Sequence, residues 1–345
     1  MKQSENTAKF GRNAFRRAVT SKIGIVTGIL LLSVFFTILS PNFLDMSNFF
    51  NIFRQQSLYV LLSLGMTQVI IIGNIDLSVG SSVALCSVVA ALFLQKCDNA
   101  FLAILVTLFT GTALGLLNGT AAAYFNMPPY IVTLATQTIF KGTAMLITGG
   151  YPVNVKNETL ISIGRGNVFG VIPTPFVIVI GFVALTWIIL NRTSLGRRIY
   201  AVGGNREAAH LAGINVNGII TYVHSMQGLL CGASAIIMIG RLATGAPNTG
   251  TGYEGQAISA SVLGGAVMGA GVGTAVGALL GALFIGVLNN GMTLLRLSTY
   301  WQDVVRGCVI FLVVLFSVLS SSNKLPLTGG GLFSRIAALF GKKKE

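Results

Sequence analysis

Long apolar segments with almost no charge dominate this chain and restrict the folds it can adopt. Only 9% of its 345 residues are charged, whereas 53% are hydrophobic. A soluble domain normally carries about 25% charged residues, so water cannot surround most of this chain. The segments commonly run for about 17 to 25 residues, which is the length that a helix needs to cross a bilayer. The sequence therefore predicts an all-α integral membrane protein in contact with membrane lipid.

The hydropathy pattern predicts about ten membrane-spanning helices. They cover residues 23–39, 57–72, 81–94, 101–124, 131–148, 174–190, 219–240, 256–268, 274–295 and 304–319. The third and eighth segments are short and are flanked by glycine-rich or polar stretches, so we expect broken or half helices buried inside the protein. An eight-span alternative treats these two segments as re-entrant loops.

The basic residues predict the orientation in the membrane. Most of the 23 basic residues fall in three regions: Lys2, Lys9, Arg12, Arg16, Arg17 and Lys22; Arg192, Arg197, Arg198 and Arg206; and Lys324, Arg335, Lys342, Lys343 and Lys344. Both span counts put these regions on one side, and basic residues collect on the cytoplasmic side. We therefore expect a cytoplasmic N-terminus (1–22), a transmembrane domain (23–320) with a cytoplasmic loop (191–218), and a cytoplasmic tail (321–345) in an inner or plasma membrane protein.

The net charge of +14 does not predict nucleic acid as a partner. Single-stranded nucleic acid is bound by basic surfaces with interleaved aromatic side chains, and no such surface is evident in this sequence. The positive-inside distribution of basic residues accounts for the charge better.

A short motif repeats at about half the length of the chain. Gly115-Leu-Leu-Asn118-Gly119 is similar to Gly286-Val-Leu-Asn289-Asn290-Gly291, with an offset of 171 residues. Repeats separated by five spans have opposite orientations in the membrane, which is a common architecture of transporters. The motif therefore predicts two inverted repeats, although a match this short and rich in glycine also arises by chance.

A carboxylate interrupts the apolar sequence between the second and third spans, in the stretch Gly73–Gly80. A carboxylate at membrane depth costs roughly 2.5 to 3.5 kcal/mol on insertion scales. One interpretation places Asp76, with Asn74 and Ser78, at a gate or on a translocation path. The alternative is a short cytoplasmic turn in which Asp76 or Ser78 caps the next helix.

Glycine and amide side chains mark further positions in the spans. Gly264-Gly265 and the following glycines lack the Lys-Ser or Lys-Thr of a phosphate-binding loop, so they predict tight packing and a kinked half helix. Asn118, Asn289 and Asn290 either bond across helices or line a polar path. Pro128-Pro129 predicts a fixed corner between the fourth and fifth spans.

The residues of an enzyme are not found in this sequence. The four cysteines are widely spaced, and His210 and His224 do not stand at a metal-ligand spacing, so we expect no metal site, no cofactor and no catalytic residue. HExxH, a Ser/His/Asp constellation and a Walker pattern are all missing. If ATP drives this chain, the ATPase is a separate subunit.

The longest polar stretch within the apolar region covers residues 195–214. Glu207–Ala212 predicts a short helix, with Asn205 as its N-cap and Gly213 as its stop. Gly203-Gly204 predicts a sharp turn before that helix. The stretch either docks a partner protein or lies on the membrane surface, anchored by Arg197 and Arg198.

Several segments resemble one family of membrane transporters. Glu207-Ala208-Ala209, followed after three residues by Gly213, resembles the EAA loop by which ABC importer permeases dock on their ATPase subunits. The chain is similar to the ABC permeases of the ribose, xylose and galactose type in the segments Gly73–Gly80, Gly115–Gly119, Pro128–Leu134, Thr193–Ile214, Gly252–Ala260 with Gly264-Gly265, and Asn290–Met292. It departs from the family pattern at Asn74, where a glycine is usual, and at Ala266-Val267.

The resemblance implies roles for particular residues. An ATPase-coupling loop would include Gly196, Arg197, Gly203, Gly204, Asn205, Glu207, Ala208, Ala209 and Gly213. A path or gate would include Asn74, Asp76, Ser78, Asn118, Gly264, Gly265, Asn289 and Asn290, and a binding-protein contact would include Tyr253 and Glu254.

The resemblance also implies a transport cycle and its partners. The partners are an ABC ATPase that carries ATP and Mg²⁺, a periplasmic or lipoprotein sugar-binding protein, and a second permease copy or paralogue. Such a subunit moves a monosaccharide, a ribose-like pentose or a similar sugar, by alternating access. Two competing hypotheses are a secondary transporter driven by an ion gradient through Asp76 and a scaffold protein without transport.

Overall fold

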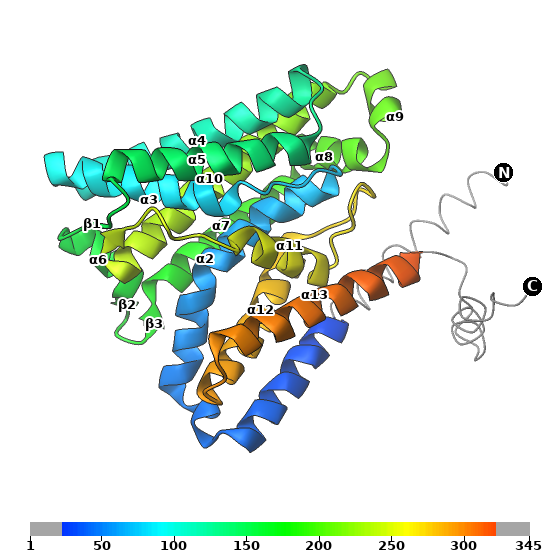
Figure 1. Cartoon of the computed structure of the whole chain (residues 1–345). Helices are drawn as coiled ribbons and strands as arrows, with labels where there is room; N and C mark the ends of the chain where they lie inside the picture. The colour runs from blue at the N-terminus through cyan, green and yellow to red at the C-terminus, as the bar shows by residue number, and fades with distance from the viewer. Residues whose placement is uncertain (1–22, 322–345) are drawn as a thin grey trace, which may run out of the picture. The chain divides into compact units, whose positions relative to one another are not determined.

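The computed structural model of the chain describes residues 23–321, so the predictions for residues 1–22 and for the tail beyond residue 321 lie outside the described part. Most of the described residues are helical (Figure 1). Residues 23–298 pack into one unit, and helix α13 (Thr299–Ser321) belongs to a second unit.

The first unit consists of long helices separated by shorter elements. It starts with a helix over Ile23–Leu39, and the long helices that follow are α2 (Met46–Ile71), α3 (Val79–Lys96), α4 (Ala100–Tyr124), α5 (Pro129–Thr148), α7 (Thr174–Arg192), α10 (Val216–Leu242) and α12 (Ala275–Leu294). The shorter helices are η1 (Pro41–Leu44), α6 (Glu158–Arg165), α8 (Ser194–Gly204), α9 (Arg206–Leu211) and α11 (Tyr253–Leu263). Two antiparallel pairs join β1 (Val153–Asn154) to β4 (Thr244–Gly245) and β2 (Asn167–Val168) to β3 (Ile172–Pro173).

The helices agree with the predicted spans. Six of the described helices, α3, α4, α5, α7, α10 and α12, are long and apolar enough to cross a membrane. The other four predicted spans coincide with the helix Ile23–Leu39 and with α2, α11 and α13. Pro128 ends the connection after α4 in an extended conformation and Pro129 is the first residue of α5, which confirms the predicted corner. The prediction of an all-α membrane protein is confirmed.

The two segments that were expected to be short behave differently. Helix α11 has 11 residues and reaches only about 16 Å at 1.5 Å per residue, so it is a half helix as predicted. The expectation of a short third segment is wrong, because α3 has 18 residues. Its serines do not interrupt the helix, since Ser81 and Ser87 donate their hydroxyl groups to backbone carbonyls within the same segment.

The packing confirms the inverted repeats. The offset of 171 residues carries α2 onto α10, α3 onto α11 and α4 onto α12. The contacts between helices are equivalent in the two repeats. Helix α4 packs on α10, and its counterpart α12 packs on α2. Helix α3 contacts α4 and α10, and its counterpart α11 contacts α12 and α2. Helix α2 runs toward α8 and α9, whereas α10 begins beside α9 and runs away, so the two repeats have opposite directions (Figure 1).

Glycines let the central helices approach closely. Gly111 and Gly115 of α4 face Gly228 and Gly232 of α10, and a Cβ atom added at any of these four positions would meet the backbone of the other helix. Small residues are the usual means by which membrane helices reach such short separations.

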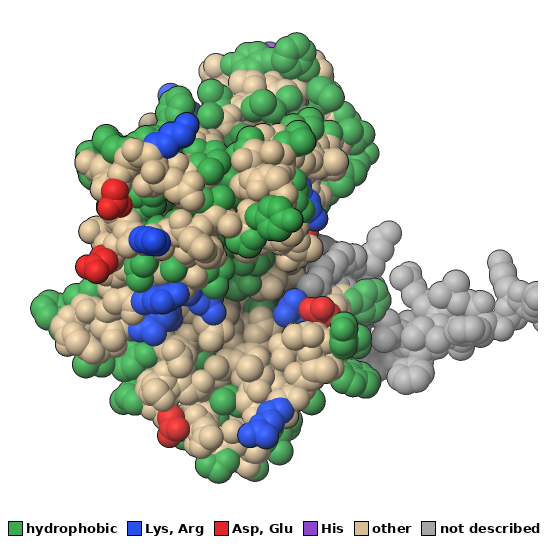
Figure 2. Space-filling view, turned by 60° about the vertical axis from the view of Figure 1, so that its left-hand side comes forward, with side chains coloured by type: hydrophobic (Ala, Val, Ile, Leu, Met, Phe, Trp, Pro, Cys, Tyr) green, Lys and Arg blue, Asp and Glu red, His purple; other side chains and the backbone are tan. Residues whose placement is uncertain are grey.

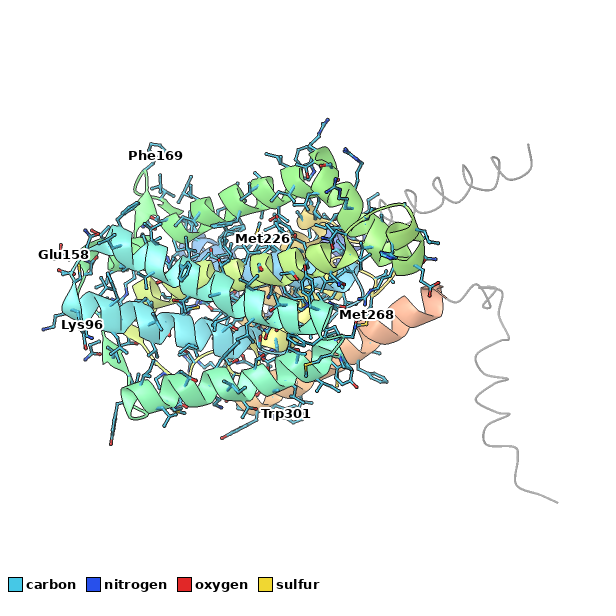
Figure 3. All side chains as sticks on the ribbon, turned by 90° about the horizontal axis from the view of Figure 1, so that it is seen from above. Lys96, Glu158, Phe169, Met226, Met268 and Trp301 are labelled. Carbon is cyan, nitrogen blue, oxygen red and sulfur yellow. The ribbon has the colours of Figure 1, made fainter. Side chains whose placement is uncertain are left out.

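The first unit has two distinct ends. Figure 1 shows α8 and α9 at one end, which we call the α9 end, and β1, α6, β2 and β3 at the other, the α6 end. In Figure 3 Lys96, Glu158 and Phe169 lie at the α6 end, Met268 lies toward the α9 end, and Met226 lies between them. Figure 2 brings the α6 end forward and shows acidic and basic side chains spread over its surface.

The first helix begins at the α9 end. Gly28 lies beside Phe284 and Gly291 lies beside Phe36, so the helix Ile23–Leu39 runs parallel to α12. Helix α12 itself starts near the α9 end, where Tyr200 of α8 donates a hydrogen bond to the carbonyl of Gly273.

Candidate functional site

The segment between α2 and α3, Ile72–Ser78, is a non-helical link buried inside the first unit. The exposed fractions of Asn74, Asp76 and Ser78 are 2%, 3% and 1%. Gly73 has a φ of +79° and its Cα atom lies close to Gly269, so this position needs glycine. Asp76 therefore lies within the protein and not in a turn exposed to solvent.

The carboxylate of Asp76 is held by the start of α3. Its Oδ1 atom accepts hydrogen bonds from the backbone N–H of Ser78 at 2.8 Å and from the Ser78 hydroxyl at 2.6 Å. The amide of Asn118 in α4 donates to the same hydroxyl oxygen at 2.8 Å. The sequence left open whether Asp76 or Ser78 caps α3. Asp76 takes this role, because the Ser78 side chain makes no cap hydrogen bond. Asp76, Ser78 and Asn118 form one cluster, which we call the Asp76 cluster.

His224 joins this cluster from α10, and the sequence did not reveal it. The imidazole is fully buried, its Nδ1 atom lies 3.8 Å from Asp76 Oδ2, and its Nε2 atom lies 3.1 Å from the amide nitrogen of Asn74. The sequence indicated no metal or acid–base role for the histidines, because they are near neither each other nor a Cys/Asp pair. An ionisable side chain within an apolar span is itself a signal of function.

Arg206, the first residue of α9, reaches from the surface to the same link. Its Nη2 atom donates to the carbonyl of Ile72 at 2.8 Å and to Oδ1 of Asn74 at 2.5 Å. Partial burial lowers the pKa of the Arg206 guanidinium from its ordinary value. A cation also suits this position because the last carbonyls of α2 carry the negative end of the helix dipole. In the sequence, Arg206 stood out only as one of the basic residues that predict the topology.

The predicted short helix of the coupling loop is present as α9. The side chain of Asn205 caps it by accepting from the backbone N–H of Ala208 at 3.0 Å, and Gly213 follows it with a φ of +79°. Glu207 and Ala208 are exposed, whereas Ala209 is buried.

The prediction of a sharp turn at Gly203-Gly204 is wrong. Both glycines end helix α8, and the chain turns at Asn205 in extended backbone. Gly203 serves close packing instead, since an added Cβ atom would meet the carbonyl of Ile71 and the Cα atom of Gly271. Gly196 is buried, and an added Cβ atom there would meet the last carbonyls of α7; Arg197 and Gly204 are exposed.

The link between α11 and α12, Gly264–Thr274, lies beside the Ile72–Ser78 link, since Gly269 is close to Gly73. Gly265, Gly269 and Gly271 all have positive φ values, as the predicted kink after a half helix requires. An added Cβ atom on Gly264 would meet the backbone of Gly277 in α12. Helix α8 contacts the end of α2 through Gly203 and this link through Tyr200, whereas Arg206 of α9 bonds to the Ile72–Ser78 link.

The remaining predicted residues lie elsewhere. Asn290 and Asn48 form a reciprocal amide pair, with N–O distances of 2.8 and 2.9 Å, which ties the end of α12 to the start of α2. Asn289 precedes it on α12, half-buried. The eight residues predicted for the path or gate thus divide into the Ile72–Ser78 link with Asn118, the Gly264-Gly265 turn, and the end of α12.

Tyr253 and Glu254 start helix α11 and are half-buried. The Tyr253 ring packs edge-on against Tyr59 at 5.1 Å, and its hydroxyl lies 3.9 Å from the sulfur of Met238. Glu254 Oε2 lies next to Gly80. Their contact with a binding protein stays a prediction.

Two further features concern ligands. A pocket of about 340 Å³ lies between α9 and the start of α10 and is lined by residues from His210 to Asn217. Within residues 23–321 no group of three or more His, Cys, Asp or Glu side chains is placed to hold a metal ion.

Comparison with known proteins identifies the family. Residues 48–314 match the family described as branched-chain amino acid transport system / permease component. The ribose import permease protein RbsC of Escherichia coli K12 is 43% identical over 88% of this chain and 96% of its own length. The RbsC protein of Bacillus subtilis 168 is 40% identical over 86% and 92%.

Permeases for other sugars match as well. The D-allose transport system permease protein AlsC of Escherichia coli K12 is 33% identical over 85% of this chain and 90% of its own length. No solved structure matches this chain. These matches cover nearly the whole described region, including the Ile72–Ser78 link and α8 and α9. The resemblance seen in the sequence is confirmed, and the chain belongs to the transport-system permease family that includes the ribose, galactose and allose import permeases.

Proposed function

We propose that this chain is the membrane-spanning permease subunit of an ABC importer that translocates a monosaccharide, a ribose-like pentose or a similar sugar. The identity of 43% to a ribose import permease over nearly the full length of both proteins is the observation that carries this proposal. Transport would proceed by alternating access, and the two inverted repeats provide the usual architecture for it.

The α9 end would face the cytoplasm and bind the ATPase. Arg192, Arg197, Arg198 and Arg206 gather there, as positive-inside topology requires. The helix Ile23–Leu39 begins at the same end, which supports a cytoplasmic N-terminus. Glu207 and Ala208 on the exposed face of α9 would contact the partner, because small side chains fit into a groove.

The other partners would bind elsewhere. ATP and Mg²⁺ would belong to the ATPase subunits, since this chain lacks a Walker pattern. A sugar-binding protein, periplasmic or a lipoprotein, would deliver the sugar at the α6 end, opposite the proposed ATPase-binding surface, and Tyr253 and Glu254 at the start of α11 remain the predicted contact residues. A second permease copy or a paralogue would complete the membrane part.

Co-purification of the ATPase tests the docking surface. We expect the wild-type permease, solubilised in mild detergent, to retain its ATPase, and the variant Glu207→Arg with Gly213→Asp to lose it. Charge reversal at Glu207 alters the exposed face of α9, and Asp at Gly213 strains the positive φ that ends this helix.

The matched control makes the same substitutions at the α6 end. Glu158→Arg with Gly170→Asp reverses an acidic residue and alters a glycine with a φ of +76°, and we expect it to keep the ATPase. If both variants retain the ATPase and both remain folded, α9 is not the docking surface.

A further inference from the structure

A continuous series of polar contacts connects the surface of the α9 end to the buried interior of the first unit. It runs from Arg206 through Asn74 and His224 to Asp76, and from there through Ser78 to Asn118. These six side chains come from α9, the Ile72–Ser78 link, α10 and α4. The series therefore joins the proposed ATPase-binding helix to both inverted repeats.

Arg206 fixes the direction of the hydrogen bonds that run through Asn74 to His224. A guanidinium can only donate, so the Asn74 atom that faces Arg206 is the carbonyl oxygen, and the amide N–H of Asn74 points to His224. The Nε2 atom of His224 must then accept, which puts the imidazole hydrogen on Nδ1. That hydrogen faces Asp76. The series has a cation at one end, a carboxylate further in, and two neutral side chains between them.

The contact between His224 and Asp76 is the longest in the series. The 3.8 Å between Nδ1 and Oδ2 is too long for a hydrogen bond, and within residues 23–321 His224 Nδ1 has no other hydrogen-bond partner. The donor–acceptor distances of the other contacts in the series are between 2.5 and 3.1 Å. A small displacement of Asn74 would move the imidazole toward or away from Asp76 and so change this distance.

We infer that Arg206 is a positioning residue that transmits displacement of α9 to the buried Asp76 cluster through Asn74 and His224. This inference rests on the proposed function, in which an ATPase moves α9. Arg206 holds the carbonyl of Ile72 and the side chain of Asn74 with one terminal nitrogen, so α9 cannot shift without pulling on the Ile72–Ser78 link. The proposal concerns a mechanical connection, and it differs from docking, which uses the outer face of α9.

The variants separate this connection from docking. Arg206→Ala removes both bonds to the link, and Arg206→Lys keeps a positive donor at the same place. We expect Arg206→Ala to retain the bound ATPase and its basal ATP hydrolysis but to transport about tenfold less sugar per ATP hydrolysed, a typical coupling effect. Arg206→Lys should recover part of this ratio. A role in docking alone would lower ATPase binding and leave the ratio unchanged.

A second variant tests whether the series acts as a unit. Asn74→Gly restores the residue that is usual in the family pattern and removes the bond partner of both Arg206 and His224. If the contacts are coupled, the double variant Arg206→Ala with Asn74→Gly should lose no more than the larger single loss. Fully additive losses would contradict the inference.

A spectroscopic measurement tests the arrangement without any activity. The chain has only two histidines, so ¹⁵N-histidine labelling of the full-length permease in lipid gives signals from His210 and His224, and His210→Gln assigns them. We expect His224 to carry its hydrogen on Nδ1 and its Nε2 signal to change in Arg206→Ala. A wild-type His224 with its hydrogen on Nε2 would overturn the series.

The combined outcomes keep the two proposals apart. If wild-type permease shows no ATP-driven uptake and binds no ATPase, the proposed function fails. If wild type transports but Arg206→Ala transports with the same ratio of sugar to ATP, or loses the ATPase while Arg206→Lys does not restore coupling, the positioning role of Arg206 is wrong.

Discussion

At the scale of single residues, the buried polar side chains explain how this apolar chain tolerates a carboxylate. Asp76 is 3% exposed, yet its Oδ1 accepts two hydrogen bonds from Ser78. A carboxylate removed from water is tolerated when its oxygens are bonded or paired. The bonds to Ser78 and the nearby imidazole of His224 provide this compensation.

Tyr200 gives a prediction at this scale with a definite pH dependence. Its hydroxyl donates to the Gly273 carbonyl at 2.8 Å, and desolvation raises the pKa of the phenol above its ordinary value of 10.0. The unfolded chain therefore ionises first as the pH rises. Stability from Tyr200 is present below about pH 10 and is lost as the pH rises from there through the folded-state pKa.

The comparison with Tyr200→Phe measures this effect. We expect wild type to be more stable than Tyr200→Phe by about 1 kcal/mol near pH 8, the usual net value of one hydrogen bond. Melting curves in detergent should show this advantage shrinking above pH 10. An advantage that stays constant between pH 8 and 11 would show that Tyr200 is not buried against the link.

At the scale of elements, α8 and α9 are attached to the first unit by close packing as well as by hydrogen bonds. Gly203 of α8 touches Ile71 and Gly271, whereas its neighbour Gly204 has no heavy atom within 4 Å of an added Cβ atom. Helix α8 is therefore packed directly on the end of α2.

These adjacent glycines give a matched pair of variants. A methyl group at Gly203 would overlap the carbonyl of Ile71, so we expect Gly203→Ala to destabilise the permease by roughly 1 to 3 kcal/mol, the usual cost of overpacking. Gly204→Ala should be neutral or slightly stabilising, because alanine suits a helix better. Thermal unfolding of both variants in the same detergent measures the difference, and equal melting temperatures would contradict the packing of α8 on α2.

The sequence predicted elements well where the signal is local. The caps of α9, Asn205 and Gly213, follow from short-range backbone chemistry, and so does the corner at Pro128-Pro129. The prediction of a turn at Gly203-Gly204 was wrong because glycine also allows close packing of helices. Sequence alone does not distinguish a glycine that allows a turn from one that allows close packing. The prediction of a short α3 was wrong because the serine hydroxyl groups donate hydrogen bonds to carbonyls of the same segment, so they do not interrupt the helix.

Long-range contacts could not be predicted in the same way. His224 lies 150 residues from Asn74 in the chain, and Arg206 lies 132 residues from it. No local pattern connects such positions. The series of polar contacts was therefore predicted only in part: Asn74, Asp76, Ser78 and Asn118 were named from the sequence as path or gate residues, whereas Arg206 and His224 were not.

At the scale of the whole molecule, each of the two inverted repeats has a non-helical link that α8 or α9 contacts. The repeat was visible in the sequence as one short motif with an offset of 171 residues, and the helices extend it over α2–α4 and α10–α12. Such repeats can rock against each other about a central site. The arrangement suits a permease moved by an external ATPase, since α8 and α9, which contact the two links, lie at the surface.

The most direct test of this account is sugar uptake into proteoliposomes that contain the permease and its ATPase. The vesicles hold ATP and Mg²⁺ inside, and the sugar-binding protein and labelled ribose are added outside. The account predicts that ribose accumulates only when ATP, the ATPase and the binding protein are all present. Uptake by the permease alone, driven by an ion gradient and abolished in Asp76→Asn, would contradict it and identify a secondary transporter.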